Sequence, residues 1–397
     1  MTKFEFFNPV KLIYGENEID RVGSETARYG RKALIVSYTD ISFYGDLFER
    51  IHSKLEENCV EFVDYLGATA NPKICEAEAG IDLGKKEKID VVIGIGGGSV
   101  MDLSKVIAAG ILYPHDLRRM IKFTHSDPNY FIPPTEALPM VLVSTLPATA
   151  SEMNATAVIT DEKTLRKSYV WEPGCLYAKV SILDPRLTLS LPKYQTACGA
   201  IDAISHAVEP FFFSDEATYG NLDLHDHMQI GVIRAIYENI PKVMEHPNDI
   251  ELRGFMQFSA TVALNGWLTC GTQGWTPMHQ MGHVLSSHKG ATHGATLACM
   301  MLAWMRYFAR RERNERFVKF ARLMWKTDDL EAASDIFEAY IEKLGVETRI
   351  SRFGCEASDL DELTQGVVDV SFNSDGLLAS IPPITREEVR KIYGISL

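Results

Sequence analysis

The sequence predicts an α/β domain followed by an all-helical domain, and three observations support this division. The chain has 397 residues, which is enough for two domains that each bury a core. Its first half alternates short β-rich apolar runs with segments of helical periodicity, as is typical of a parallel sheet covered by helices. After about residue 190 the β-rich runs disappear and helical periodicity dominates. We therefore expect an α/β domain over residues 1–190 and an all-α domain over residues 191–397.

The strands and helices of the first half follow one another in a regular order. Each β-rich run is followed by a segment with the apolar spacing of a helix. In chain order these are a strand at 32–38, a helix at 46–57, a strand at 60–66, a helix at 74–88, a strand, glycine turn and helix within 89–112, and a strand at 138–146. This alternation predicts successive β–α–β units.

Helical periodicity organises the second half. The predicted helices cover residues 194–213, 221–244, 250–266, 315–325 and 332–345. Five large apolar side chains in this half are interpreted mainly as core residues rather than cleft lining. They are Phe255, Phe258, Trp267, Trp275 and Met281.

The charge and cysteine content argue against several classes of protein. With 40 basic and 53 acidic residues the net charge is −13, which disfavours nucleic acid or an anionic membrane as a partner, because both attract clustered Lys and Arg. The seven cysteines form no CxxC pair, as expected for reduced thiols. The N-terminal residues lack a signal-peptide pattern, and no apolar run approaches the roughly 20 residues that span a bilayer. We expect a soluble, cytoplasmic protein.

A glycine-rich turn lies in the stretch GIGGGSVMD. Gly96, Gly97 and Gly98 let the backbone approach a ligand, and the free N–H groups at the start of the next helix favour a phosphate. Asp102 suits the positive end of that helix. Ser99 occupies the last glycine position of the dinucleotide fingerprint, so a tight turn without a ligand is the alternative. We favour phosphate binding, and hence a Rossmann-like dinucleotide-binding domain.

Two further loops carry polar residues suited to a nucleotide. The loop STLPATASE offers Thr145, Thr149 and Ser151 to a ribose or phosphate, although this signal is weak by itself. Asp40 follows the strand at 32–38, where the adenine ribose of a dinucleotide is expected. A carboxylate there would accept hydrogen bonds from both ribose hydroxyls of NAD and repel the 2′-phosphate of NADP. An ordinary solvent-facing carboxylate is the alternative.

Histidines gather near residue 280. The stretch MHQMGHVLSSHKGATHG holds four of the eleven in the chain, His279, His283, His288 and His293. Neutral imidazole is the commonest metal ligand, and chance clustering is the alternative. On one straight helix His279 and His293 would lie about 21 Å apart, so they can share an ion only if the chain turns between them. Gly290 and the poor helix formers around it supply that break.

An aspartate and a histidine lie one helical turn apart in GAIDAISHAVEP. The i, i+4 spacing of Asp202 and His206 puts both side chains on one face of a helix. They either chelate one ion or form a hydrogen-bonded pair, and the spacing favours neither. With up to three histidines from the stretch near residue 280 they would make a one-carboxylate, three-imidazole site. Such a site suits Fe(II) or Zn(II), and its lack of cysteine argues against structural zinc.

Taken together, these motifs resemble the iron-containing (group III) alcohol dehydrogenases. GGGSVMD, TLPATASE, DAISH and the H-x-x-x-H…H-G pattern occur in the order and spacing of that family, and the resemblance covers nearly the whole chain. The stretch TLPATASEMNA is most similar to the butanol dehydrogenase and aldehyde reductase branch. The resemblance implies an NAD- or NADP-dependent oxidoreductase that acts on a small alcohol or aldehyde and forms a homodimer.

The resemblance also implies roles for single residues, which spacing could not choose. The implied metal ligands, for Fe²⁺ or Zn²⁺, are Asp202, His206, His279 and His293. His283 is implied to be a catalytic histidine that does not bind the metal, and His288 matches no role and is expected at the surface. The implied cofactor residues are Gly96, Gly97, Gly98 and Ser99 at the pyrophosphate with Asp102 nearby, Thr145 and Thr149 in the second loop, Lys167 at the ribose and Asn71 lining the cleft.

Cofactor choice and reaction class follow from the same comparison. NADPH-using members tend to have a small, glycine-rich loop where this chain has Asp40, so we expect NAD(H). A glycerol-dehydrogenase-like or dehydroquinate-synthase-like enzyme on the same scaffold is an alternative, although one aspartate with three histidines favours the alcohol dehydrogenases. A metal-dependent hydrolase is an alternative of another class, and it would leave the glycine turn without a role.

Overall fold

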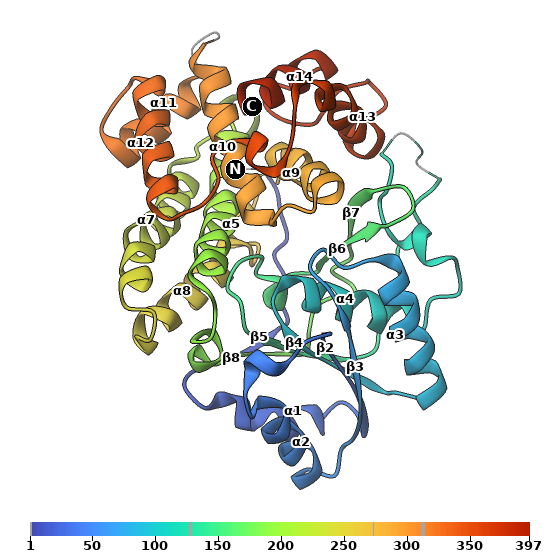
Figure 1. Ribbon diagram of the computed structural model, residues 1–397. Coiled ribbons are helices and arrows are strands. Elements are labelled where there is room, and N and C mark those ends of the chain that lie inside the picture. The colour runs from blue at the N-terminus through green and yellow to red at the C-terminus, as the bar shows by residue number, and fades with distance from the viewer. Residues whose placement is uncertain (1, 126, 128, 273, 311–313) are drawn as a thin grey trace.

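A six-stranded parallel sheet forms the centre of the N-terminal half (Figure 1). The computed structural model describes residues 2–125, 127, 129–272, 274–310 and 314–397. The strands of the sheet are β1 (Lys11–Tyr14), β2 (Lys32–Tyr38), β3 (Glu61–Ala68), β4 (Val91–Gly96), β5 (Met140–Ser144) and β8 (Val180–Leu183). Neighbours in the order β1-β8-β5-β4-β2-β3 all pair in parallel. The predicted parallel sheet is therefore confirmed.

The strand order explains where the glycine turn lies. Without β1, the strands β2, β3, β4, β5 and β8 have the doubly wound order 2-1-3-4-5. In such a sheet the direction of winding reverses between the first and third strands, and ligands bind outside the carboxyl ends of the strands at that point. The third strand, β4, ends at Gly96. The turn thus lies at the switch point although it does not follow the first strand.

Helices cover both faces of this sheet. Those on one face are α1 (Val22–Thr26) and α2 (Leu47–Glu57), and those on the other are α3 (Ile74–Glu87) and α4 (Gly98–Gly110) (Figure 1). Side chains of β2 alternate between the two cores, with Leu34 on the α3–α4 side and Ile35 on the α1–α2 side. Burial on both faces explains why β4 reads as a continuous apolar run.

A separate antiparallel hairpin was not predicted. It consists of β6 (Thr156–Asp161) and β7 (Arg166–Trp171), and Ala157, Ile159 and Val170 pack into the core beside α4. Polar and charged residues interrupt both strands, so the sequence gives no clear strand signal there. The strands β1 and β8 were missed as well, because each has only four residues.

The C-terminal half is helical, as predicted. Its helices are α5 (Lys193–Phe212), α6 (Glu216–Tyr219), α7 (Asp223–Glu245), α8 (Ile250–Ala263), α9 (Pro277–Lys289), α10 (His293–Ala309), α11 (Glu315–Trp325), α12 (Leu330–Lys343), α13 (Leu360–Ser371) and α14 (Arg386–Ile395). They pack around α5 and α10. Within the part of the chain that the structure describes, no helix combines the length and hydropathy needed to cross a bilayer. The boundary at residue 190 stays a prediction.

The core prediction for the large apolar residues of this half is wrong for three of them. Phe255, Phe258 and Trp267 are 41%, 48% and 50% exposed, whereas Met281 is buried. Helix α8 turns Met256 and Ala260 inward, and its two phenylalanines lie on other faces. The ring of Trp267 instead stacks on Phe6, with centroids 4.2 Å apart. These aromatic residues form part of the surface.

Candidate active site

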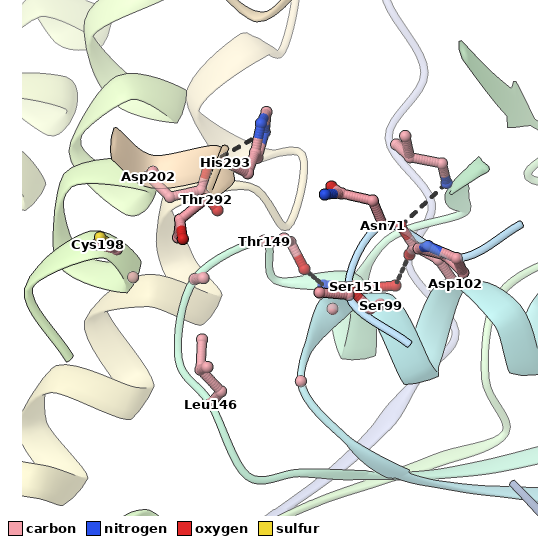
Figure 2. Close-up of a pocket in the computed structure, with 18 of the residues that line it drawn as sticks. Asn71, Ser99, Asp102, Leu146, Thr149, Ser151, Cys198, Asp202, Thr292 and His293 are labelled. Carbon is pink, nitrogen blue, oxygen red and sulfur yellow. Dashed lines mark hydrogen bonds and ion pairs between the residues drawn. The ribbon is translucent and has the colours of Figure 1, made fainter. Parts of the chain in front are cut away.

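A cavity of about 1050 Å³ lies between the two halves and gathers most of the predicted site residues. Figure 2 shows Asp202 and His293 on one side and Asn71, Ser99 and Asp102 on the other. Gly96 is the one predicted site residue that does not line the cavity. Those that do are Asp40, Asn71, Gly97, Gly98, Ser99, Asp102, Thr145, Thr149, Lys167, Asp202, His206, His279, His283 and His293. His288 lies outside this cavity, half-buried rather than at the surface.

The glycine turn forms a close junction between β4 and α4. Gly97 is the N-cap of α4, and its N–H donates to the Tyr38 hydroxyl at 3.3 Å. A Cβ on Gly98 would lie 2.6 Å from the Thr149 side chain, so glycine lets the second loop approach the start of the helix. Gly96 allows close packing inside the turn, because a Cβ at this position would lie 2.5 Å from the Val100 side chain. Gly98 and Ser99, in the first turn of α4, line the cavity, and free N–H groups at the start of a helix stabilise an anion.

Asp102 holds the second loop in place. One of its carboxylate oxygens accepts from the Ser151 hydroxyl at 2.6 Å, and the other accepts from the Val158 N–H at 3.0 Å. Burial raises the pKa of this carboxyl group. The fully buried Lys105 donates to Ser151 at 2.8 Å and to the Asn154 carbonyl at 2.9 Å. This network fixes the loop that carries Thr149 against α4.

Lys167 and Asn71 line the cavity and contact one another. The Lys167 ammonium donates to the Asn71 side-chain oxygen at 2.7 Å, which joins β7 to the loop after β3. Burial lowers the pKa of Lys167 to about 8, against the opposing effect of Asp102 and Asp202. Asp40 lies in the exposed loop after β2, and its carboxylate accepts from the Ser42 N–H at 2.9 Å.

Three helices bring the predicted metal ligands together. Asp202 and His206 lie one turn apart on α5, His279 is on α9, and His293 is the first residue of α10. The Asp202 Oδ1 is 3.6 Å from the His206 Nε2, 3.7 Å from the His279 Nε2 and 3.6 Å from the His293 Nε2. One ligand atom from each of Asp202, His206 and His279 falls within 4.8 Å of the others.

Two glycines allow the chain to return His293 to this point. Helix α9 ends at Lys289, and Gly290 follows it with φ of 66°, a left-handed conformation that ends a helix at low cost. A Cβ on Gly294 would lie 2.0 Å from the Cys198 carbonyl oxygen, so only glycine lets the start of α10 pack this closely on α5. The predicted break between His279 and His293 is confirmed.

The cluster fits a divalent cation. The Asp202 Oδ1, His206 Nε2 and His279 Nε2 are buried and make no hydrogen bond within the described residues. Ligands about 2.1 Å from a tetrahedral metal are about 3.4 Å apart, close to the spacing seen here. Burial lowers the pKa of His206 to about 3, so this imidazole is neutral, as a metal ligand must be. The pKa of His279 is lowered by burial but raised more by Glu209 and Asp202, to about 9.

His283 lies beside the cluster. Its ring centroid is 5.1 Å from that of His293 and 6.3 Å from that of His279, one turn away on α9. Burial, with Lys167 nearby, lowers its pKa well below the usual value, so the ring is neutral. Its Nδ1 makes no hydrogen bond to any described residue. A neutral imidazole in this position can accept or pass a proton in the cavity.

Glu209 was missed by the sequence analysis. It is fully buried on α5, and its carboxylate accepts hydrogen bonds from the Nδ1 of His279 and from the N–H groups of Met278 and His279. The spacing in the sequence could have indicated it, because Glu209 follows Asp202 by seven residues, which is two helical turns along the same face.

Comparison with known proteins identifies the family. The family model "Iron-containing alcohol dehydrogenase" matches residues 9–185, and the model "Fe-containing alcohol dehydrogenase family, C-terminal" matches residues 196–397. The chain belongs to the iron-containing alcohol dehydrogenase family. The resemblance seen in the motifs is thus confirmed, and an alcohol dehydrogenase or aldehyde reductase is favoured over the hydrolase and the related scaffold enzymes.

Alcohol dehydrogenases and an aldehyde reductase match this chain over nearly their whole length. The chain is 32% identical to NADH-dependent butanol dehydrogenase A of Clostridium acetobutylicum, covering 99% of both chains. It is 27% identical to the NADPH-dependent aldehyde reductase YqhD of Escherichia coli, covering 99% of both. The crystal structure of NADH-dependent butanol dehydrogenase A from Thermotoga maritima superimposes with a TM-score of 0.90 at 32% identity, covering 100% of this chain and 99% of that one.

Proposed function

We propose that this iron-containing alcohol dehydrogenase transfers hydride between NAD(H) and a small alcohol or aldehyde, with Fe²⁺ as its metal and Zn²⁺ as a substitute. One observation carries the proposal: the Asp202 cluster and the glycine turn of α4 face the same cavity. A hydride transfer needs the substrate and the nicotinamide in contact, and a cavity shared by the two proposed binding sites supports such a contact.

We assign metal binding and cofactor binding to different residues of the cavity. Asp202, His206, His279 and His293 would hold the metal, which when bound supplies a Lewis acid for the substrate oxygen. The turn from Gly97 to Ser99 would hold the cofactor pyrophosphate, with Gly96 packed behind it and Asp102 fixing the loop beside it. Thr145, Thr149, Lys167 and Asn71 would contact the rest of the cofactor.

His283 is the proposed proton carrier. It is neutral, it lies in the cavity, and its Nδ1 has no partner among the described residues. A neutral imidazole has one N–H and one nitrogen that can accept, so this ring would relay the proton that moves to or from the substrate oxygen, accepting at one nitrogen and donating from the other.

Asp40 and the names of two relatives support NAD(H). The relatives from Clostridium acetobutylicum at 32% and 30% identity are named NADH-dependent, whereas the aldehyde reductase at 27% is named NADPH-dependent. Asp40 borders the cavity near the carboxyl end of β2, where a carboxylate would repel a 2′-phosphate.

A substrate panel tests the proposal. Protein stripped of metal and reloaded with Fe²⁺ or Zn²⁺ would be assayed with short aldehydes and alcohols, each with NADH or NADPH. We expect aldehyde reduction with NADH, and no turnover in metal-free protein. Turnover that is independent of the metal, or hydrolysis without cofactor, would contradict it.

We also propose a homodimer, supported by an aromatic surface at the edge of the sheet. Strand β1 is an edge strand, and the exposed aromatic residues near it include Phe4, Phe7, Tyr14, Phe258 and Trp267. Large exposed apolar patches of this kind mark interfaces. Light scattering should give twice the chain mass of 44.4 kDa, and Trp267→Asp should shift the mass towards the monomer. A monomeric wild type would overturn the proposed homodimer.

We propose the cytoplasm as the location of the protein, to be checked by cell fractionation.

A further inference from the structure

The buried carboxylate of Glu209 is fixed in one orientation behind His279. Its Oε1 accepts from the Met278 N–H at 2.6 Å and from the His279 N–H at 3.2 Å, both at the start of α9. Its Oε2 faces the Nδ1 of His279. Glu209 is fully buried, so these three donors define what the carboxylate contacts.

This orientation determines the form of the His279 ring. An ionised carboxylate only accepts hydrogen bonds, so the Nδ1 of His279 carries a hydrogen and donates it. The other nitrogen, Nε2, points to the Asp202 Oδ1 at 3.7 Å and has no hydrogen bond within the described residues. When a cation binds, Nε2 gives up its hydrogen and presents its lone pair to the site, while Nδ1 keeps its hydrogen and donates it to Glu209.

His206 lacks such a partner. Neither of its ring nitrogens makes a hydrogen bond to any residue that the structure describes, so nothing on its own helix selects which nitrogen faces Asp202. His279 is therefore the better-defined ligand of the two. Its ring direction and its proton are both set by a residue of the neighbouring helix α5.

We propose that Glu209 is a positioning residue that holds His279 in the Nε2-binding form and thereby sets the affinity of the cation site. This inference rests on the cation site proposed above and adds a residue that does not touch the cation. Partners of metal-binding histidines of this kind change metal affinity by about 10- to 100-fold.

The variant Glu209→Gln reverses the ring form. It keeps the size of the side chain, and the two N–H donors of α9 require its amide oxygen at the Oε1 position. The amide NH₂ then faces the Nδ1 of His279, which must accept, so the ring hydrogen moves to Nε2. Glu209→Ala leaves space for water and leaves the ring free to adopt either form. We expect Glu209→Gln to weaken cation binding by about 100-fold and Glu209→Ala by about 10-fold.

Metal titration measures this without turnover. Metal-free protein would be titrated with Co²⁺ by visible absorption and with Zn²⁺ by competition, and NADH binding would confirm that each variant is folded. The control is Glu25→Gln, which changes a buried glutamate that pairs with Lys11 and Arg21 in the other half of the chain. It should leave the Co²⁺ affinity unchanged.

The order of the two variants decides the question. Weaker binding in Glu209→Gln than in Glu209→Ala supports the proposal, because a role in packing alone would make the smaller alanine the worse substitution. Wild-type affinity in both variants, or a larger loss in Glu209→Ala, would overturn it. A wild type that binds neither ion would instead overturn the cation site itself.

Discussion

Two histidines of α9, His279 and His283, have different surroundings. They lie one turn apart on α9, and their spacing gives each the same chance of binding a metal. The structure separates them: His279 points its Nε2 at Asp202 and has Glu209 behind it, whereas His283 packs against the other rings. The two should therefore respond differently to substitution.

His279→Ala should lose most of the bound metal, because it removes a ligand and leaves the Glu209 carboxylate buried without its ring partner. His283→Ala should keep the metal and lower kcat by about 100-fold, a typical loss for a proton carrier. Elemental analysis and steady-state kinetics of the purified variants check both. Retention of metal by His279→Ala together with its loss from His283→Ala would falsify the assignment.

Asp40 should govern cofactor choice at the same scale. The wild type should prefer NADH, and Asp40→Gly should raise kcat/KM for NADPH by about tenfold, a difference of about 1.4 kcal/mol in binding. Because Asp40 is exposed, we expect Asp40→Gly to change the free energy of unfolding only slightly. Kinetics with both cofactors are the measurement. A wild-type preference for NADPH contradicts the role proposed for this carboxylate.

At the scale of elements, the start of α4 and the second loop act as one unit. The glycine turn supplies N–H groups, and Asp102 and Lys105 clamp the loop to the same helix. The affinity of the proposed cofactor site should therefore depend on both segments and on the hydrogen-bond network between them.

Gly97→Val should weaken NADH binding by more than tenfold. A Cβ there would lie 3.1 Å from both the Tyr38 hydroxyl and the Leu146 side chain, and the branched methyl groups would extend into the pyrophosphate position. The Tyr38 hydroxyl is the far end of a side chain and can shift, whereas the Leu146 Cβ moves only with its loop backbone, so we expect a local adjustment of that loop and a fold that survives. Fluorescence titration with NADH gives the affinity, and thermal melting is the control. An unchanged dissociation constant contradicts the phosphate role.

Lys105→Met should loosen the second loop. The ammonium donates to Ser151, to both oxygens of Asn154 and to the Thr156 carbonyl, and methionine would remove all four of these hydrogen bonds. We expect a loss of unfolding free energy on the order of 3 kcal/mol and a raised KM for NADH, with metal content unchanged. Denaturant unfolding and kinetics measure these effects. A rise in the aldehyde KM alone would show that the loop does not serve the cofactor.

For the whole molecule, a cation would tie α5, α9 and α10 together. Those three helices meet at Asp202 and carry much of the C-terminal core. At a hundred times its dissociation constant, a metal stabilises the fold that binds it by about 2.7 kcal/mol. Chelation of the metal should lower the melting temperature by several degrees. If the boundary at residue 190 separates two folding units, calorimetry should show this lower melting temperature in the transition of the helical half. His288→Ala, outside the cavity, should melt and respond to chelation like the wild type.

The sequence predicted the elements whose signals are local. Residues 32–38 form an apolar β-rich run, helices α5, α7, α8, α11 and α12 carry periodic apolar patterns, and the break after α9 is marked by Gly290. The four-residue strands and the polar hairpin were missed, because pairing with neighbours decides their structure. The prediction that Phe255 and Phe258 are buried was wrong for a similar reason, because the packing of α8 beside β1 decides which of its faces stays exposed.

By itself the sequence determined the fold class, the family and the residue types of the site, because motif order and periodicity are properties of the chain. Only the tertiary structure decided which atoms meet. Asp202 comes within 3.7 Å of three histidines because Gly294 lets α10 pack on α5 and Gly290 reverses the chain. Glu209 reaches His279 across 70 residues of sequence. Contacts between distant segments depend on packing, and helical spacing carries no information about the helix on the other side.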